Sequence, residues 1–209
     1  MGVLESGSTS LRRLRCGLMV ASATSYCGVG RCLVLAAKHT GSQDLLSECG
    51  HLLARALLGL PELALMPRDL ALVPIRSSGA TRAQAGADPA WLIAKRAEVV
   101  LAEQGVDACV VELLRVRGRH VAQKALDQRA RELNAEGSMR VGSLRGVRSR
   151  RIVLVDDVLT TGATLTEARR AITQAGGQAS VAVTVASVRK VQPSDPFGRS
   201  ADGSKPTSR

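Results

Sequence analysis

The sequence predicts an α/β fold in which an open, mostly parallel sheet is flanked by helices. Short apolar runs alternate with longer segments of helical period, and this alternation is typical of βαβ units. The run at 151–157 is apolar at almost every position before its last two, as expected for a central parallel strand that is buried on both faces. The 209 residues suit one domain.

The expected elements follow in order along the chain. Asp88 and Pro89 fit the N-cap and the first turn of a helix, and Gly176-Gly177 is a helix stop. Between such signals, the apolar spacing decides between helix and strand. Helices are predicted at 32–38, 43–58, 88–104, 120–133 and 164–175, and strands at 70–75, 109–114, 151–157 and 178–186.

Composition excludes several classes of function. Aromatic residues make up 1% of the chain, which disfavours a protein that stacks the bases of single-stranded nucleic acid. No apolar run reaches the ~18 residues of a membrane span, so no membrane partner is expected. The five cysteines contain no C-x-x-C pair, which fits reduced thiols in a cytoplasmic protein better than disulfides or a zinc site.

The charge of the chain points to anionic partners. The net charge is +11, and the segment 115–151 alone carries +8. Such a balance favours nucleic acid, a membrane surface or phosphorylated small molecules as partners. A solvated basic face is the alternative that charge alone leaves open.

One segment, 151–168, carries a pattern of chemical groups that suits a ligand site. Its apolar strand ends in Asp156 and Asp157, and a Thr/Gly loop then leads into a helix. Ligands bind at the carboxyl ends of strands in open α/β sheets, and a helix N-terminus attracts phosphate. Gly162 allows the backbone to approach that phosphate closely. The hydroxyls of Thr160, Thr161 and Thr164 are further donors.

The two acids need a different partner, because they would repel a phosphate. They fit hydroxyl groups, a developing cation or a magnesium shell. A Walker B strand would need a G-x-x-x-x-G-K-[ST] motif, which does not occur, and Gly28-Val-Gly30 lacks the third glycine of a dinucleotide fingerprint. A buried strand followed by a capped helix is the remaining alternative, but it leaves two adjacent acids at a cost without a role.

The segment Val153–Leu165 resembles the phosphoribosyl-pyrophosphate (PRPP) motif of type I phosphoribosyltransferases. Other positions resemble the ComF family, which is competence-protein-like and related to amidophosphoribosyltransferases. The similarity covers roughly residues 26–190. The positions that carry it are Tyr26, Gly28, Lys38, Gly41, the strand Leu72–Ile75, Gln123, Leu126, Arg131 and Asn134.

The resemblance implies a domain plan. A type I phosphoribosyltransferase-like domain is expected at 25–190, with a small N-terminal helical hood at about 25–60 and a PRPP-binding core at about 68–190. Residues 1–24 are expected to form a flexible leader. The polar, Pro/Gly/Ser-rich stretch 191–209 is expected to be a disordered tail.

The resemblance also implies a reaction, the Mg²⁺-dependent displacement of pyrophosphate from PRPP by an acceptor that the sequence does not identify. Such an enzyme is a glycosyltransferase of nucleotide metabolism. Asp156 and Asp157 are the implied catalytic residues, and Mg²⁺ is held mainly through PRPP, with no metal site made of protein side chains alone. The implied 5-phosphate ligands are Thr160, Thr161, Gly162, Ala163 and Thr164. Candidates for the pyrophosphate end or a closing lid are Arg76, Ser77, Arg115, Arg117, Gln123 and Arg131.

A second hypothesis comes from a departure from the family pattern. Ala85 stands where the family usually has an arginine, and the four-cysteine zinc module of many members is absent. Ala85 and the family's association with competence favour a catalytically weak or inactive PRPP-sensing or DNA-uptake accessory protein. Nucleic acid is compatible with the charge but is not favoured, and a homodimer is a candidate assembly.

Overall fold

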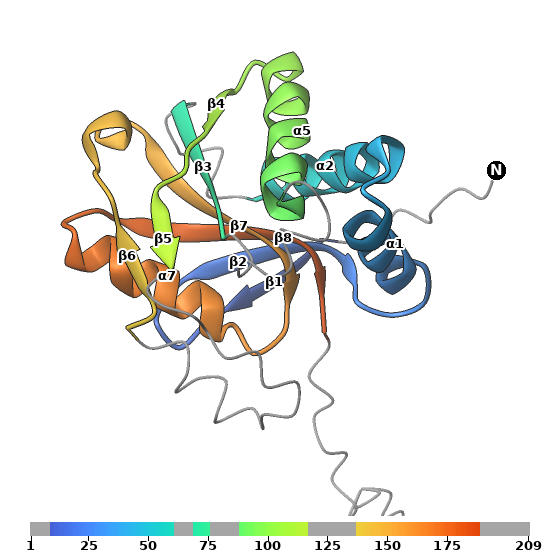
Figure 1. The fold of residues 1–209 in the computed structure, drawn as a ribbon, viewed down its shortest axis with the longest axis horizontal. Coiled ribbons are helices and arrows are strands. Elements are labelled where there is room, and N and C mark those ends of the chain that lie inside the picture. Colours follow the sequence, from blue (N-terminus) through green and yellow to red (C-terminus); the bar gives the residue numbers. More distant parts are fainter. Residues whose placement is uncertain (1–8, 61–68, 76–87, 117–136, 189–209) are drawn as a thin grey trace, which may run out of the picture.

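A six-stranded sheet forms the centre of the computed structural model, which describes residues 9–60, 69–75, 88–116 and 137–188 (Figure 1). Its strand order is β1-β2-β8-β7-β3-β4. The first pair is antiparallel and all other neighbours are parallel, so the prediction of an open, mostly parallel sheet is confirmed. The strands are β1 (Ser10–Arg13), β2 (Met19–Ser25), β3 (Asp69–Pro74), β4 (Asp107–Val110), β7 (Arg151–Leu159) and β8 (Ala179–Ser187).

Helices cover both faces of this sheet, so the molecule has three layers (Figure 1). Three helices pack on one face through a leucine- and alanine-rich core, which takes Val153, Val155 and Val183 from the strands. The other face packs Leu154 and its neighbours against the fourth helix and a small two-stranded sheet. The helices of the first face are α1 (Gly28–Thr40), α2 (Gln43–Leu58) and α5 (Pro89–Glu103); the second face carries α7 (Ala163–Gln174), β5 (Leu114–Val116) and β6 (Met139–Val141), with the short η1 (Arg145–Val147) before β7.

A buried acid ties the two-stranded sheet to α7. Glu167 is only 3% exposed, and its carboxylate accepts the Met139 N–H at 2.9 Å and pairs with Arg170 at 2.6 and 2.8 Å. Burial alone would raise the pKa of Glu167, but the Arg170 charge and the N–H donors outweigh it and lower the pKa. The ionised acid therefore holds β6 in place.

Most predicted elements agree with the structure to within a few residues. The helix expected at 43–58 is α2, and the strand expected at 151–157 continues to Leu159. The strand expected at 109–114 is wrong, because β4 ends at Val110 and β5 begins at Leu114, where the chain crosses to the second sheet. The helix expected at 120–133 and the tail at 191–209 lie outside the described residues.

The expectation of a leader at 1–24 is wrong for the described residues 9–24. These residues form β1 and most of β2, and Val20–Ala23 are buried in the sheet. Small residues suit this position, because β2 is buried beside β8 and its Ser22 hydroxyl bonds to the Thr184 hydroxyl at 2.7 Å. The Ser, Thr and Gly of this segment are therefore a misleading sign of disorder.

Within the described parts of the chain, no helix combines the length and the apolar character that crossing a membrane requires.

Candidate functional site

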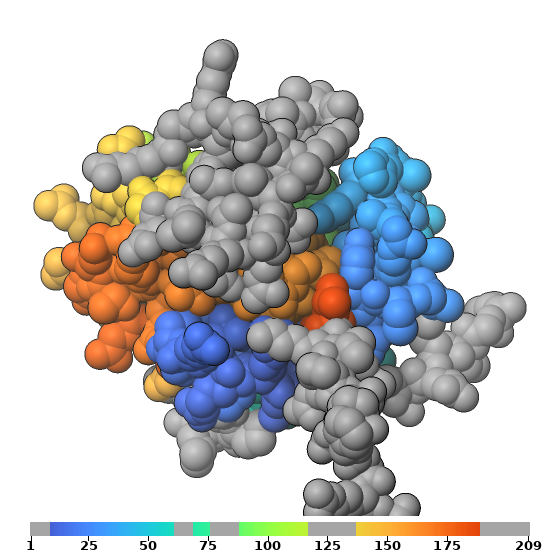
Figure 2. All heavy atoms as spheres, turned by 90° about the horizontal axis from the view of Figure 1, so that it is seen from below, coloured from blue at the N-terminus to red at the C-terminus, as the bar shows by residue number. Residues whose placement is uncertain are grey.

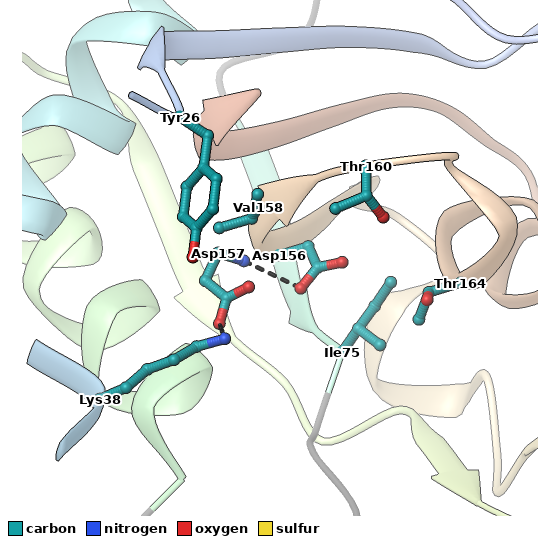
Figure 3. Close-up of a pocket in the computed structure, with 8 residues that line it drawn as sticks. All are labelled: Tyr26, Lys38, Ile75, Asp156, Asp157, Val158, Thr160 and Thr164. Atoms are coloured by element: carbon teal, nitrogen blue, oxygen red, sulfur yellow. Dashed lines mark hydrogen bonds and ion pairs between the residues drawn. The ribbon is translucent and has the colours of Figure 1, made fainter. Parts of the chain in front are cut away.

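Four of the predicted site residues surround one cavity at the carboxyl edge of the parallel strands (Figure 3). The cavity measures about 330 Å³. Asp156 and Asp157 lie at the end of β7, which has β8 on one side and β3 on the other. The full lining is Tyr26, Lys38, Ile75, Asp156, Asp157, Val158, Thr160 and Thr164. Two chemically different groups, carboxylates and loop hydroxyls, therefore face the same space.

Lys38 comes from the end of α1 and forms an ion pair with Asp157. The Asp157 side chain is 12% exposed and that of Lys38 is 31% exposed. Burial lowers the pKa of Lys38, but the charges of Asp157 and Asp156 outweigh burial, so the pKa is raised above its ordinary value. Lys38 is therefore a fixed positive charge beside the acids, a role that the sequence left open.

Asp156 is the acid whose ionisation is disfavoured in the folded protein. Burial, together with the neighbouring charge of Asp157, raises the pKa of Asp156 to about 8. Asp156 accepts a hydrogen bond from the Asp157 N–H at 2.9 Å, and Lys38 is positively charged. Both lower the pKa of Asp156, but they do not offset the increase from burial and Asp157. Without a ligand, the folded protein thus favours a protonated Asp156 near neutral pH, and a cation or hydroxyl donors in the cavity would favour the ionised form.

Tyr26 closes the cavity on the side of α1. Figure 3 shows its ring pointing into the cavity, with the hydroxyl directed toward Asp157. The residue follows β2 and precedes α1, and its N–H donates to the Ser187 carbonyl at 2.8 Å. Tyr26 was noted in the sequence only as part of a family pattern, because its distance along the chain from Asp157 hides their proximity.

The Thr/Gly loop joins β7 to α7 through a glycine in the left-handed conformation. Gly162 has φ 86°, in the left-handed region, and α7 begins directly after it. The Thr161 hydroxyl accepts the Ala163 N–H at 3.2 Å. The first turn of α7 contains no acidic residue, so nothing there offsets the positive end of the helix dipole.

The N-terminal hairpin supports this loop from behind. Arg12 donates to the carbonyls of Thr160 and Thr161 at 3.2 and 3.3 Å. Leu14 packs where a side chain on Gly162 would lie: a Cβ there would stand 2.8 Å from the Leu14 Cδ1 atom. No local pattern in the sequence marks these contacts, because they join a hairpin near the N-terminus to a loop far along the chain.

Of the other site candidates, the structure describes Thr161, Gly162, Ala163 and Arg115, and these four do not line the cavity. Arg115 is described, and it lies exposed on β5 directly opposite Arg140. The other candidates for the pyrophosphate end or a lid, namely Arg76, Ser77, Arg117, Gln123 and Arg131, lie outside the described residues. Ile75, which lines the cavity, directly precedes Arg76.

The donors in the cavity suit a hard cation that a ligand brings with it. Among the described residues no cluster of three or more His, Cys, Asp or Glu side chains could hold a metal ion. Asp156 and Asp157 nevertheless offer carboxylate oxygens, which are the ligands that Mg²⁺ prefers, and Mg²⁺ commonly combines one or two carboxylates with substrate phosphates and water.

Comparison with known proteins finds similarity only at the level of structure. No protein-family model and no curated protein matches the chain. Structural neighbours are adenine phosphoribosyltransferases. The enzyme from Trypanosoma brucei, solved with AMP, pyrophosphate and ribose-5-phosphate, is 13% identical, with coverage of 96% of both chains and a TM-score of 0.45. The enzyme from Leishmania tarentolae is also 13% identical, with 85% of this chain and 94% of that chain covered and a TM-score of 0.42. Likeness of this size carries no argument about function.

Proposed function

We propose that this protein binds PRPP together with Mg²⁺ and transfers its phosphoribosyl group to an acceptor. One observation carries the proposal: the acid pair at the end of β7 and the Thr/Gly loop at the start of α7 line the same cavity. A phosphorylated sugar is a ligand that needs both groups, since its phosphate suits a helix N-terminus and its hydroxyls suit carboxylates.

The ligand is divided between the two groups according to charge. The 5-phosphate lies at residues 160–164, where backbone N–H groups and threonine hydroxyls donate. The ribose hydroxyls donate to Asp156 and Asp157, which precede this loop by only a few residues along the chain. Bound Mg²⁺ would be held by PRPP oxygens with these two carboxylates as the available protein ligands, and it would offset the charge of the pyrophosphate leaving group.

The reaction breaks the bond between ribose C1 and pyrophosphate and forms a bond from C1 to the acceptor. As the bond breaks, positive charge develops on the sugar. Asp156 and Asp157 lie where carboxylates would stabilise that charge, and a fixed arrangement of such groups is an effective form of catalysis. The acceptor enters beside Tyr26 and Lys38, which come from the region expected to form the hood.

The finer family and cellular assignments belong to the same proposal. Membership of a ComF-like family rests on the sequence patterns at 26–41 and 123–134, the second of which lies outside the described residues. A cytoplasmic location and a homodimer are compatible with it.

The Lys38–Asp157 ion pair favours a second candidate, a protein that binds PRPP without turnover. Asp157 is engaged by Lys38, and this pair has to open, or to share the carboxylate, before Asp157 meets a ribose hydroxyl. Binding alone would not require the Asp157 carboxylate to leave Lys38, whereas turnover would require it to face the sugar.

Calorimetry with PRPP in the presence and absence of Mg²⁺ tests the proposal. Binding should require Mg²⁺ and should weaken at least ~10-fold, equivalent to ~1.4 kcal/mol, in Thr161→Val. Thr166→Val is the matched control, because Thr166 is exposed on α7 and its side-chain hydroxyl contacts the Cys16 thiol at 3.7 Å, outside the cavity lining. Absence of PRPP binding by the wild-type protein, or equal affinity in Thr161→Val, would reject the assignment.

Release of pyrophosphate from PRPP, measured with a panel of bases and amines, separates the two candidates. Release with any acceptor favours the transferase. Tight binding with no release across the panel favours the sensing or accessory role.

A further inference from the structure

The N-terminal hairpin holds the anion-binding loop from the side opposite its ligand. Arg12 uses both terminal nitrogens of its guanidinium, Nη1 on the Thr160 carbonyl and Nη2 on the Thr161 carbonyl. These carbonyls are 148 and 149 residues away along the chain. Figure 2 shows the same proximity on the surface, where the dark-blue N-terminal segment lies directly against the orange segment around α7.

Because the peptide bond is planar, these two contacts also determine the direction of the N–H groups that follow each carbonyl. In a trans peptide the carbonyl of one residue and the N–H of the next point in opposite directions. Fixing the Thr160 carbonyl on Arg12 therefore aims the Thr161 N–H away from Arg12. Fixing the Thr161 carbonyl aims the Gly162 N–H in the same way.

The two N–H groups that Arg12 orients have no acceptor among the described residues. The neighbouring Ala163 N–H bonds to the Thr161 hydroxyl, and α7 makes its own bonds further on. Thr161 is partly buried and Gly162 is buried, where an unpaired donor is costly. Both donors are thus oriented and available for an anion.

The hairpin is a suitable support because it is itself held firmly. β1 pairs with β2 in continuous register, with Arg12 opposite Val20, and β2 is buried beside β8. Leu14, 7% exposed, fills the space beside Gly162 that a side chain would need. The loop is therefore fixed by a hydrogen-bonded fork at Thr160 and Thr161 and by packing at Gly162.

We propose that Arg12 is a positioning residue for phosphate binding. It orients the N–H groups of Thr161 and Gly162 toward a phosphate monoester, and its charge offsets the partial negative charge of the two carbonyls behind the loop. The inference rests on the proposed function for its ligand, but the orientation of the loop by Arg12 can be tested without any ligand.

The first experiment measures hydrogen exchange of the Ala163 N–H, which bonds to the Thr161 hydroxyl inside the loop, in the ligand-free, full-length protein. Arg12→Ala should speed exchange there at least ~5-fold, while exchange in the β8 core stays unchanged. Arg12→Lys keeps the charge but not the two-pronged geometry, so its exchange should resemble that of Arg12→Ala. Arg13→Ala is the control, because Arg13 is exposed and reaches only Gly17 within the hairpin, at 3.5 Å.

The second experiment measures the affinity for ribose 5-phosphate, which carries the phosphate monoester without pyrophosphate. Arg12→Ala should bind at least ~5-fold more weakly, and Arg12→Lys should recover part of this loss through its charge. Leu14→Ala tests the packing contact with Gly162 independently. It provides a second variant of the hairpin support if an Arg12 variant fails to fold.

The outcomes distinguish the inference from the proposed function. If the wild-type protein does not bind ribose 5-phosphate, the proposed function fails, and the exchange result still decides whether Arg12 orients the loop. Unchanged exchange of the Ala163 N–H in Arg12→Ala overturns the inference, as does equal affinity of Arg12→Ala and Arg13→Ala when the wild type binds.

Discussion

The two sides of the cavity are built in different ways. The acid side, Asp156 and Asp157, is held by charges: one acid is paired with Lys38 and the other has a raised pKa. The loop side, residues 160–164, is held by backbone geometry, with Gly162 at φ 86° and two carbonyls fixed by Arg12. Only a few residues of the chain separate them.

This difference assigns different sensitivities to the two sides. The acid side should respond to pH and to nearby charges, because its ionisation is balanced between burial and Lys38. The loop side should respond to changes of shape, because its donors are peptide groups that do not titrate. A loop variant that changes the pH dependence, or an acid variant that acts only through shape, would contradict this distinction.

The largest expected effect is on turnover, through the acid side. If pyrophosphate release is observed, Asp156→Asn and Asp157→Asn should each lower it about 100-fold, or ~2.7 kcal/mol, with PRPP affinity changed only a few-fold. Carboxylates that face a developing cation act chiefly in the transition state. Initial rates at saturating PRPP, together with calorimetric affinities, measure the two quantities. A loss of affinity with intact turnover per bound complex would contradict this role.

The next effect is on affinity, through the loop side. Gly162→Val should weaken PRPP binding at least ~10-fold, or ~1.4 kcal/mol, because the left-handed conformation is costly for a β-branched residue and its side chain would meet Leu14. Combining Leu14→Ala with Gly162→Ala separates the two causes, since the double variant removes the contact but keeps the backbone strain. Full recovery of affinity in the double variant would show that the φ of Gly162 is unimportant.

A third effect is on stability as a function of pH. Because the pKa of Asp156 is raised in the folded state, the folded protein holds a proton that the unfolded chain has lost, and stability should fall as pH rises from about 4 to about 8. Asp156→Asn should remove this fall, so its gain in stability over the wild type should be largest at pH 8 and small near pH 4. Urea unfolding at several pH values measures this.

A control variant tests whether that pH effect is specific to Asp156. Asp107→Asn changes an exposed acid that pairs with Arg150 at 2.9 Å, so it should not show the same gain at pH 8. An equal gain in Asp107→Asn would attribute the effect to the net charge of the protein.

The smallest effect concerns the charge beside the acids. Lys38→Met should destabilise the protein by about 1 kcal/mol at pH 7, since it leaves a partly buried carboxylate without its partner. It should also extend the pH-dependent fall upward, because Lys38 lowers the pKa of Asp156. Lys95→Met is the control: its pair with Glu98 is more exposed and lies within one helix turn, so its loss should cost only ~0.3 kcal/mol. Equal losses in urea unfolding would remove the special role of Lys38.

The sequence predicts the segment 151–168 well because its chemistry is local. A buried strand, two acids, a Thr/Gly loop and a helix start lie within one stretch, so their order along the chain is also their order in space. The central strands, α2 and α7 follow from apolar spacing for the same reason.

The rest of the site was hidden because it depends on distant contacts. Arg12 and Leu14 reach the loop from a hairpin whose small polar residues resemble those of an irregular segment. Lys38 and Asp157 are 119 positions apart, and nothing local marks them as partners. Sequence reasoning therefore found the acids and threonines that line the cavity and missed the residues that hold them in place.

The most direct test of the account measures proton release when Mg²⁺-PRPP binds near pH 7. Calorimetry in two buffers with different ionisation heats gives this number for the wild type, Asp156→Asn and Gly162→Ala. A ligand that meets the acid side should favour ionised Asp156, so the wild type should release more protons than Asp156→Asn. Gly162→Ala should bind more weakly but keep the wild-type release, because its change is confined to the loop side. No binding by the wild type, or equal release by the wild type and Asp156→Asn, would contradict the claim that both sides of the cavity hold one ligand.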